Sequence, residues 1–447
     1  MALTGIEIFK YLPKTNCAEC GIATCLAFAM NVAAAKTGID KCPYISDQIK
    51  ETLVESSAPP VRQILFGTGS QEVKLGGESV LFRHERRFEN QTAIGLLLTT
   101  GAACQVNDDK VASFKELRYE RAGHKLAADF FFVENDNNSS KDFLNLLMKV
   151  KDIAALAVCA YSLQDAKQAM TVVGQCKPLL CGALEEDLEG YIALAKQYGC
   201  PLAIVALSLP QARAMTQKAL SLGFKDLVFS VGTGGSVAAG LEFSVETRNA
   251  AVKDKDKLLG FPTLLYPCAF NKDLPGQFLN ASILMAKYAS ALVMSEFKGQ
   301  FLYPLLTARL NIFTDPQRPL TMPQSIYTIG KADENSPVVL SCNFALTYFI
   351  VSAEIENSMV PAHFIIKDTE GLSVLTAWAA GKFSADSIAA YVKKSGIADK
   401  VTHRKLIIPG YVSIESAALE EELPGWQVIV GPQDAAALPA FLKQWSC

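Results

Sequence analysis

The 447-residue chain has no strong imbalance of charge and no long apolar run. Forty-two lysines and arginines stand against forty-five aspartates and glutamates, which gives a formal net charge of −3 at pH 7. Because nucleic-acid binding depends on clustered positive charge, this composition argues against a nucleic-acid partner. No stretch of about eighteen apolar residues occurs, and the first residues do not resemble an export signal, so we expect a cytoplasmic protein that spans no membrane.

Histidine is also scarce, and the usual catalytic motifs are missing. The four histidines are His84, His124, His363 and His403, and neither of the first two stands at a metal-ligand spacing. The sequence shows no nucleophile elbow, zincin motif or kinase signature. The glycine-rich stretch SVGTGGSVAAG at residues 230–240 lacks both the Lys-Ser/Thr of a P-loop and the third glycine of a dinucleotide fingerprint. We therefore name no catalytic residue.

Cysteine is plentiful, and four of the twelve cysteines lie close together near the start of the chain. Cys17, Cys20, Cys25 and Cys42 follow the spacing C-x2-C-x4-C-x16-C, and Pro43 comes directly after the last of them. In a reducing compartment, clustered cysteines are more often metal ligands than disulfides. A module of about sixty residues has only a small core and usually needs a bound metal or a covalent cross-link to be stable. Residues 1–58 are therefore predicted to form a metal-binding module.

The spacing alone leaves three interpretations of this module open. It favours a four-iron cluster, although it matches neither the bacterial nor the plant-type ferredoxin pattern. A structural zinc site also takes four thiolates, but it commonly pairs them in two short C-x2-C knuckles. Unliganded thiols are the third possibility. The other eight cysteines are scattered, and most are expected to be small buried apolar residues: Cys104, Cys159, Cys176, Cys181, Cys200, Cys268, Cys342 and Cys447.

The middle of the chain alternates short apolar runs with amphipathic segments. SSAPPV at residues 56–61 is typical of a linker, and VRQILFGTGSQEVKLGGESVLFRHE after it predicts a pair of β-hairpins. Eight apolar runs follow, beginning at Thr92, Asp129, Ala155, Lys177, Pro201, Asp226, Pro262 and Ala291. Eight strand–helix units over about 230 residues favour a TIM (β/α)8 barrel, placed at residues 61–325.

The pattern restarts in the C-terminal part, where residues 335–447 predict a compact α/β domain. PVVLSCN, AHFIIKD, RKLIIPG and WQVIVGP are expected to be strands, and the expected helices are FALTYFIVSAEIEN, GLSVLTAWAAG, ADSIAAYVKKSG and DAAALPAFLKQW. Such sheets bind ligands beyond the carboxyl ends of their strands. The turns expected there carry few titratable groups, which suits a large ligand held by packing and hydrogen bonds: Asn343, Thr347, Gly371, Ser373, Thr376, Gly410 and Gly431.

Together with the cysteine module and the barrel, the stretches NFALTY, DTEGLSVLTAWAAGKF and IIPG closely resemble the large (gamma) subunit of the corrinoid iron-sulfur proteins of the acetyl-CoA (Wood-Ljungdahl) pathway. The resemblance runs the whole length, from LTGIEIFKYLPKTNCAECG to GWQVIVGP. It implies a multidomain α/β protein with a small N-terminal iron-sulfur module, a central TIM barrel and a C-terminal Rossmann-like α/β corrinoid-binding domain. It also implies a [4Fe-4S] cluster on Cys17, Cys20, Cys25 and Cys42.

The same resemblance implies a cobamide, a B12-type corrinoid, on the C-terminal domain. The contacts that it suggests are Cys342, Asn343, Thr347, Tyr348, Gly371, Leu372, Ser373, Val374, Leu375, Thr376, Gly410 and Gly431. Thr376 is the candidate for the residue below the cobalt. Many other B12-binding domains ligate cobalt through a D-x-H-x-x-G motif, and neither His363 nor His403 stands in one. The cobalt is therefore expected to have no protein histidine beneath it, which favours reduction to Co(I).

By this resemblance the chain is a methyl carrier within a methyltransferase system. Its Co(I) corrinoid would accept a methyl group from methyltetrahydrofolate through a separate methyltransferase and donate it to acetyl-CoA synthase. The cluster would re-reduce cobalt that has oxidised to Co(II). The implied partners are a small subunit in a heterodimer, the methyltransferase, acetyl-CoA synthase and a low-potential electron donor. The alternatives are a stand-alone pterin-dependent barrel methyltransferase with a structural metal site and a zinc-stapled scaffold.

Overall fold

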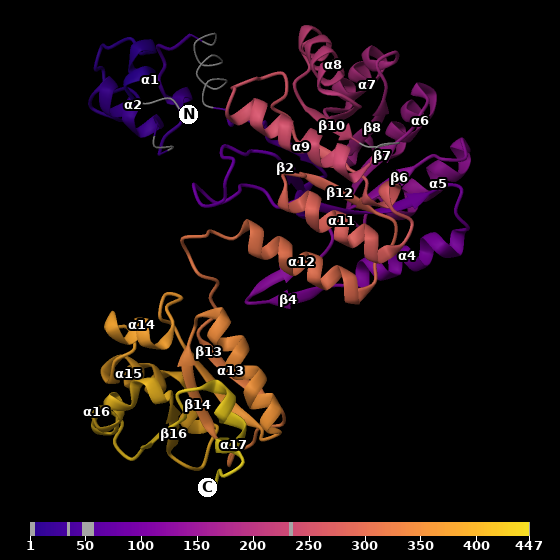
Figure 1. Ribbon diagram of the computed structural model, residues 1–447. Coiled ribbons are helices and arrows are strands. Elements are labelled where there is room, and N and C mark those ends of the chain that lie inside the picture. Colours follow the sequence, from indigo (N-terminus) through magenta and orange to yellow (C-terminus); the bar gives the residue numbers. More distant parts are fainter. Residues whose placement is uncertain (1–4, 34–35, 47–57, 232–235, 447) are drawn as a thin grey trace. The chain divides into compact units, whose positions relative to one another are not determined.

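A computed structural model describes residues 5–33, 36–46, 58–231 and 236–446 (Figure 1). The chain forms two compact units. The first comprises Met1–Tyr119 and Leu126–Phe313, and the second comprises Glu120–Lys125 and Thr314–Cys447. The predicted linker at residues 56–61 begins outside the described residues, and the glycine-rich stretch at 230–240 lies partly outside them. Among the helices described, none is both long and apolar enough to cross a membrane.

The N-terminal module consists of two short α-helices and a 3-10 turn. Helices α1 (Gly5–Tyr11) and α2 (Cys25–Ala33) pack together, and η1 (Ile39–Lys41) follows. The core of the module is small, as its length predicts. It contains the buried residues Ile8, Leu12, Cys25, Phe28, Ala29, Cys42 and Ile45. Two of the seven residues in this core are cysteines from the predicted cluster, so the thiols are part of the packing.

The next segment forms one β-hairpin where the sequence predicted two. Strands β1 (Ile64–Phe66) and β2 (Val73–Leu75) pair antiparallel, with their outer residues buried and their central residues exposed. The second predicted hairpin is wrong, because Gly76 and Gly77 both adopt positive φ and turn the chain away from the ladder. The buried residues of the hairpin join the interior of the barrel that follows.

All eight predicted central strands are present and close into a parallel barrel. In the order of the barrel they are β3 (Ala93–Thr99), β6 (Phe130–Glu134), β7 (Ala155–Cys159), β8 (Leu179–Ala183), β9 (Leu202–Val205), β10 (Leu227–Val231), β11 (Thr263–Leu265) and β12 (Ala291–Met294). The helices between and after them are α4 (Cys104–Glu116), α5 (Ser140–Val150), α6 (Leu163–Val173), α7 (Leu188–Tyr198), α8 (Leu209–Ser221), α9 (Val237–Val252), α10 (Pro267–Phe270), α11 (Leu274–Ala286) and α12 (Gly299–Phe313). Figure 1 shows these helices around the outside of the strands.

Aromatic rings and small residues fill the barrel interior. The rings of Phe66 and Phe130 meet edge to face at 5.5 Å, and those of Phe132 and Tyr266 do so at 5.3 Å. A side chain at Gly95 would place its Cβ 2.4 Å from the Phe130 ring, so only glycine fits there. The interior is therefore a packed core, as in other barrels of this kind.

A buried ion pair ties the segment after the hairpin to helix α9. Arg248 Nη1 lies 3.6 Å from Glu78 Oε2, and the two side chains are only 7% and 5% exposed. Arg248 also donates to Val80 O at 3.0 Å and lies over the ring of Tyr288. Glu78 accepts a hydrogen bond from the Glu89 amide at 3.0 Å. Burial raises the pKa of the Glu78 carboxyl, and Arg248 opposes that shift.

Replacing Arg248 with methionine is expected to destabilise the barrel by about 3–5 kcal/mol, because it leaves a buried carboxylate without its cation. Urea unfolding followed by far-UV circular dichroism measures the loss. The matched control is Arg62→Met, which removes an exposed pair with Asp226 and should cost at most about 1 kcal/mol. An Arg248→Met protein that unfolds at the wild-type urea concentration would contradict the prediction.

The second unit is built on a five-stranded sheet. Its strand order is β13 (Ser325–Ile329), β15 (Ala362–Lys367), β14 (Val338–Cys342), β16 (Lys405–Ile408) and β17 (Gln427–Val430). The four predicted strands, β14 to β17, are parallel, whereas β13 is an antiparallel edge strand that was not predicted. The helices are α13 (Ala345–Ser358), α14 (Val374–Ala379), α15 (Ala385–Ser395), α16 (Ser416–Glu422) and α17 (Leu438–Leu442). Helix α16 was also not predicted.

Helices cover both faces of this sheet. Ile355 of α13 and Leu442 of α17 belong to one buried cluster, and Ala377, Ile388 and Leu419 of α14, α15 and α16 belong to another. The chain passes from β14 to β15 on one side and then returns to β16 on the other side of β14. The strand order therefore reverses between β14 and β16, where open parallel sheets leave a crevice for a ligand.

A small hairpin from the barrel sequence also belongs to the second unit. Strands β4 (Tyr119–Arg121) and β5 (His124–Leu126) form a two-stranded sheet between α4 and β6. The guanidinium group of Arg121 lies 4.1 Å from the centre of the Phe349 ring on α13. This cation–π contact joins residues more than 200 positions apart, and no local sequence pattern indicates it.

Candidate cofactor sites

The four N-terminal cysteines of the predicted cluster line one small hollow. Cys17 is exposed, Cys20 is half-buried, and Cys25 and Cys42 are buried. Cys17 and Cys20 come from the loop before α2, Cys25 is the first residue of α2, and Cys42 follows the turn η1. The lining is otherwise largely apolar and includes Leu12, Pro13, Ile22, Phe28 and Pro43. The fold thus brings together three cysteines from one segment and a fourth that is 17 positions further along the chain.

The loop that carries Cys17 and Cys20 has an unusual backbone. Asn16 and Ala18 adopt positive φ values of 50° and 59°, and Gly21 adopts 80°. Non-glycine residues seldom take this conformation, and they keep it where the surroundings require it. Where the backbone alternates between left- and right-handed conformations, successive N–H groups can point into one concave space. Such a space is a favourable binding site for an anion. Asn16 Oδ1 also accepts a hydrogen bond of 2.8 Å from the Cys25 amide and fixes the start of α2.

The donor set fits an iron-sulfur cluster better than a single metal ion. Among the residues that the structure describes, no group of three or more His, Cys, Asp and Glu side chains is already arranged around one ion position. Four thiolates on one zinc ion must crowd around a single centre, whereas a four-iron cluster takes one thiolate at each iron atom. Four thiols spread around a hollow therefore suit the larger group.

The second site is a cavity of about 250 Å³ in the C-terminal unit. It lies at the carboxyl ends of β14, β16 and β17, where the strand order reverses, and α13 forms one wall. The cavity is largely apolar. Five of the residues predicted to contact a corrinoid line it, namely Thr347, Ser373, Val374, Leu375 and Gly431. The structure thus brings together residues from α13, from the start of α14 and from the turn after β17.

The rim of this cavity exposes large apolar side chains. Ile350, Leu375 and Tyr411 are 47%, 50% and 55% exposed, and all three line the cavity. A contiguous apolar surface of this kind marks a binding site. Ile350, Tyr411 and Gln433 were not predicted as site residues. Ile350 lies one helical turn after Thr347, so the helical period could have revealed it.

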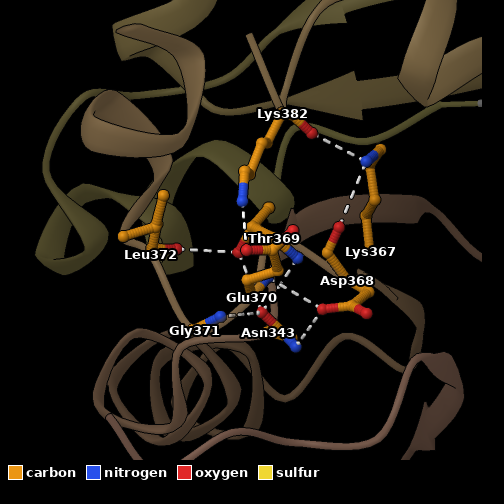
Figure 2. A network of polar contacts seen from close by, with 8 residues as sticks. All are labelled: Asn343, Lys367, Asp368, Thr369, Glu370, Gly371, Leu372 and Lys382. Atoms are coloured by element: carbon orange, nitrogen blue, oxygen red, sulfur yellow. Dashed lines mark hydrogen bonds and ion pairs between the residues drawn. The ribbon is translucent and has the colours of Figure 1, made fainter. Parts of the chain in front are cut away.

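Asn343, another predicted contact, is buried and shapes the loop after β15 (Figure 2). Its Oδ1 accepts hydrogen bonds from the Thr369 amide at 3.0 Å, the Thr369 hydroxyl at 2.8 Å and the Gly371 amide at 3.0 Å. Its Nδ2 donates to Asp368 Oδ1 at 2.8 Å. Gly371 has a φ of 80°, and a Cβ there would lie 2.6 Å from Pro319. Both residues therefore hold in place the loop that leads to Ser373.

Further charged groups flank the same loop. Lys367 Nζ donates to Lys382 O at 2.7 Å and to Asp368 O at 3.2 Å, and burial lowers the pKa of its ammonium group. Lys382 forms an ion pair with Glu370 (Figure 2). These contacts hold the loop between β15 and α14, and they set the direction in which the chain enters α14.

The remaining predicted contacts do not line the cavity. Cys342 is fully buried, and Tyr348 stacks on Phe364 with ring centres 5.4 Å apart. Leu372 accepts a hydrogen bond from the Thr369 hydroxyl. Thr376 is exposed, and its hydroxyl lies 3.0 Å from that of Ser373. A Cβ at Gly410 would lie 2.6 Å from Gly431 O, so this glycine allows the turns after β16 and β17 to approach each other.

Neither His363 nor His403 lines the cavity. His363 is near the start of β15 and hydrogen-bonds to Asp333 O at 3.0 Å, and His403 precedes β16 and bonds to Ser336 O at 2.9 Å. Both stand at the amino ends of parallel strands, whereas the cavity lies at the carboxyl ends.

A thiol-lined hollow, a closed barrel and an open sheet with a ligand crevice define a multidomain cofactor protein. Comparison with family models agrees. Residues 63–442 match the family described as "CO dehydrogenase/acetyl-CoA synthase delta subunit", and residues 12–44 match the family described as "Putative Fe-S cluster". The chain therefore belongs to the CO dehydrogenase/acetyl-CoA synthase subunit family, in its corrinoid/iron-sulfur protein large (gamma) subunit branch.

Full-length relatives support that placement. The chain is 38% identical to the corrinoid/iron-sulfur protein large subunit of Moorella thermoacetica, over 99% of both chains. It is 31% identical to the acetyl-CoA decarbonylase/synthase complex subunit gamma of Methanothermobacter thermautotrophicus, again over 99% of both. It is 30% identical to the subunit gamma of Methanocaldococcus jannaschii, over 99% of this chain and 96% of that one. The family model carries the name of a delta subunit, but the relatives that match from end to end are large or gamma subunits.

Proposed function

We propose that this chain carries methyl groups for acetyl-CoA synthesis, with a cobamide in the C-terminal cavity and a [4Fe-4S] cluster on the four N-terminal cysteines. One observation carries the proposal: the chain that gathers Cys17, Cys20, Cys25 and Cys42 around one hollow also has an open apolar cavity at the switch point of its C-terminal sheet. When bound, the cobamide would supply a Co(I) centre that accepts a methyl cation equivalent and returns to Co(I) when the methyl group is passed on, and the cluster would supply single electrons at low potential.

The residues of the C-terminal cavity would bind and orient the cobamide. Thr347, Ser373 and Gln433 offer polar atoms at its wall, while Val374, Leu375 and Tyr411 supply apolar surface. Because no histidine lines this cavity, the chain offers no imidazole to the cobalt there. Thr376, one helical turn beyond Ser373, remains the candidate for the residue nearest the lower face of the metal.

The exposed rim gives the proposed partners a place to dock. A cavity that leaves Leu375 and Tyr411 half-exposed would leave one face of a bound corrin open to approach. We propose that a small subunit covers this face in a heterodimer and gives way to the methyltransferase and to acetyl-CoA synthase in turn. A low-potential donor would deliver electrons to the N-terminal module, where Cys17 is exposed.

The direct test is an anaerobic purification followed by a visible absorption spectrum and a metal analysis. We expect corrinoid bands together with broad iron-sulfur absorption, about four iron atoms and one cobalt atom per chain. A colourless protein that contains zinc would overturn the proposal and support a zinc-stapled scaffold. Iron or zinc without corrinoid, together with pterin binding to the isolated chain, would instead support the stand-alone barrel methyltransferase.

A further inference from the structure

A hydrogen bond joins the two segments that carry the four cysteines. Glu19 lies between Cys17 and Cys20, and Tyr44 lies two residues after Cys42. The Tyr44 hydroxyl donates to Glu19 Oε1 at 2.7 Å across 25 positions of sequence. Both side chains are exposed, so the contact adds nothing to the packed core of the module.

This contact fixes the position of a negative charge beside the thiol-lined hollow. Cys17 and Cys20, on either side of Glu19, line the hollow, and Pro43 next to Tyr44 lines it as well. In this contact the Tyr44 hydroxyl is the donor and the Glu19 carboxylate is the acceptor, so the bond leaves the charge of Glu19 in place.

A fixed carboxylate matters to a redox centre because it repels an added electron. The potential of an iron-sulfur cluster depends on nearby net charge, on hydrogen bonds and on solvent exposure. Water and salt screen the field of an exposed carboxylate such as Glu19, so its effect on the cluster depends on how close it stays to the thiols. Glu19 is held from the opposite segment of the site, so its distance from the thiols is set by the fold.

We infer that Tyr44 positions the Glu19 carboxylate against the cluster site and thereby lowers the reduction potential of the bound cluster. This inference rests on the proposed function, since it assumes a [4Fe-4S] cluster on the four cysteines. It assigns a separate role to two residues that ligate nothing. Glu19 supplies the charge, and Tyr44 acts through Glu19 as a positioning residue.

The test compares the midpoint potential of the cluster in the full-length holoprotein and its variants, by redox titration followed by electron paramagnetic resonance. Glu19→Gln should raise the potential, because it removes the charge. Tyr44→Phe should raise it by a smaller amount, because it frees the carboxylate to move into solvent. A rise of about 59 mV would lower the equilibrium constant for passing one electron onward tenfold, and we expect shifts up to that size.

Two controls separate this effect from a general change of charge or surface. Glu7→Gln removes the same charge from the exposed surface of α1, and Tyr11→Phe removes an exposed phenol at the end of that helix. Neither control should move the potential. An unchanged potential in Glu19→Gln, or an equal shift in Glu7→Gln, would overturn the inference.

The same samples show which proposal has failed. Wild-type protein without iron and acid-labile sulfide would overturn the proposed function itself. A complete cluster in wild type and in Glu19→Gln, with identical potentials, would overturn only the role of Glu19. If Glu19→Gln does not retain its cluster, Tyr44→Phe decides, because it preserves the charge, and an unchanged potential in that variant counts against the inference.

Discussion

The Cys20→Ala variant is expected to lose reductive repair of the corrinoid while keeping methyl transfer by corrinoid that has already been reduced. Cys20 lines the N-terminal hollow together with the other three thiols. With one ligand gone, the site has three thiols for four iron atoms, and the cluster should be lost or altered. The proposed cobamide cavity lies in a different compact unit, and Cys20 is not among the residues that line it.

The two activities are measured separately on the same preparation. Reactivation is followed as the rate at which the oxidised corrinoid is reduced by a low-potential donor, and we expect at least a tenfold loss. Methyl transfer is started from chemically reduced protein and should stay close to the wild-type rate. Cys104→Ala is the matched control, because Cys104 is an exposed thiol on α4. Equal loss of both activities would contradict the proposed division of labour between the two sites.

The central barrel could be predicted because nearly every residue of its strands is buried. Strands β7, β8 and β10 are buried at every position, so each appears in the sequence as a continuous apolar run. The helices between them alternate apolar and polar residues and begin at serine caps such as Ser162 and Ser208. Local sequence therefore carries enough information to count the strand–helix units and identify their order.

Elements at the margins of the units could not be predicted in the same way. Strand β13 has only one buried residue of five, Ile329, and is a strand because it pairs with β15, which lies more than thirty positions away. Arg121 of the β4–β5 hairpin contacts Phe349, which lies more than 200 positions further along the chain. Strand pairing across such distances depends on the assembled fold, and a short window of sequence does not indicate which strands will pair.

In the candidate sites, too, features set by local sequence were predicted, whereas contacts between distant segments were not. The spacing of the cysteines predicted a common site, and in the structure all four line one hollow. Of the contacts predicted in the C-terminal unit, five line the cavity and the others do not, and the sequence did not separate the two groups. Asn343 and Thr347 both follow β14. Thr347 lines the cavity, whereas the side chain of Asn343 accepts hydrogen bonds from the loop after β15. That distinction depends on which way each side chain points.

Asn343→Ala is expected to destabilise the C-terminal unit by about 2–4 kcal/mol, because it leaves the buried amides of Thr369 and Gly371 without an acceptor. Thr369 is 1% exposed and Asn343 4%, so water cannot readily replace the lost oxygen. The loop that carries Gly371 leads directly to Ser373, Val374 and Leu375 at the cavity wall. A loosened loop should therefore also lower the retention of the proposed cobamide.

All three tryptophans, Trp378, Trp426 and Trp445, lie in the C-terminal unit, so their fluorescence during urea unfolding reports on that unit alone. The matched control is Asn357→Ala on the exposed surface of α13, where the side chain makes only a long bond of 3.4 Å to Glu354 and its loss should cost less than about 0.5 kcal/mol. Asn343→Ala should shift the fluorescence transition to lower urea and release cobamide faster on gel filtration. If Asn343 instead touched the ligand without supporting the loop, retention would fall while the unfolding transition of the cobamide-free protein stayed in place. The network around Asn343 predicts that both change together, because the amides that it holds set the path of the chain toward the cavity wall.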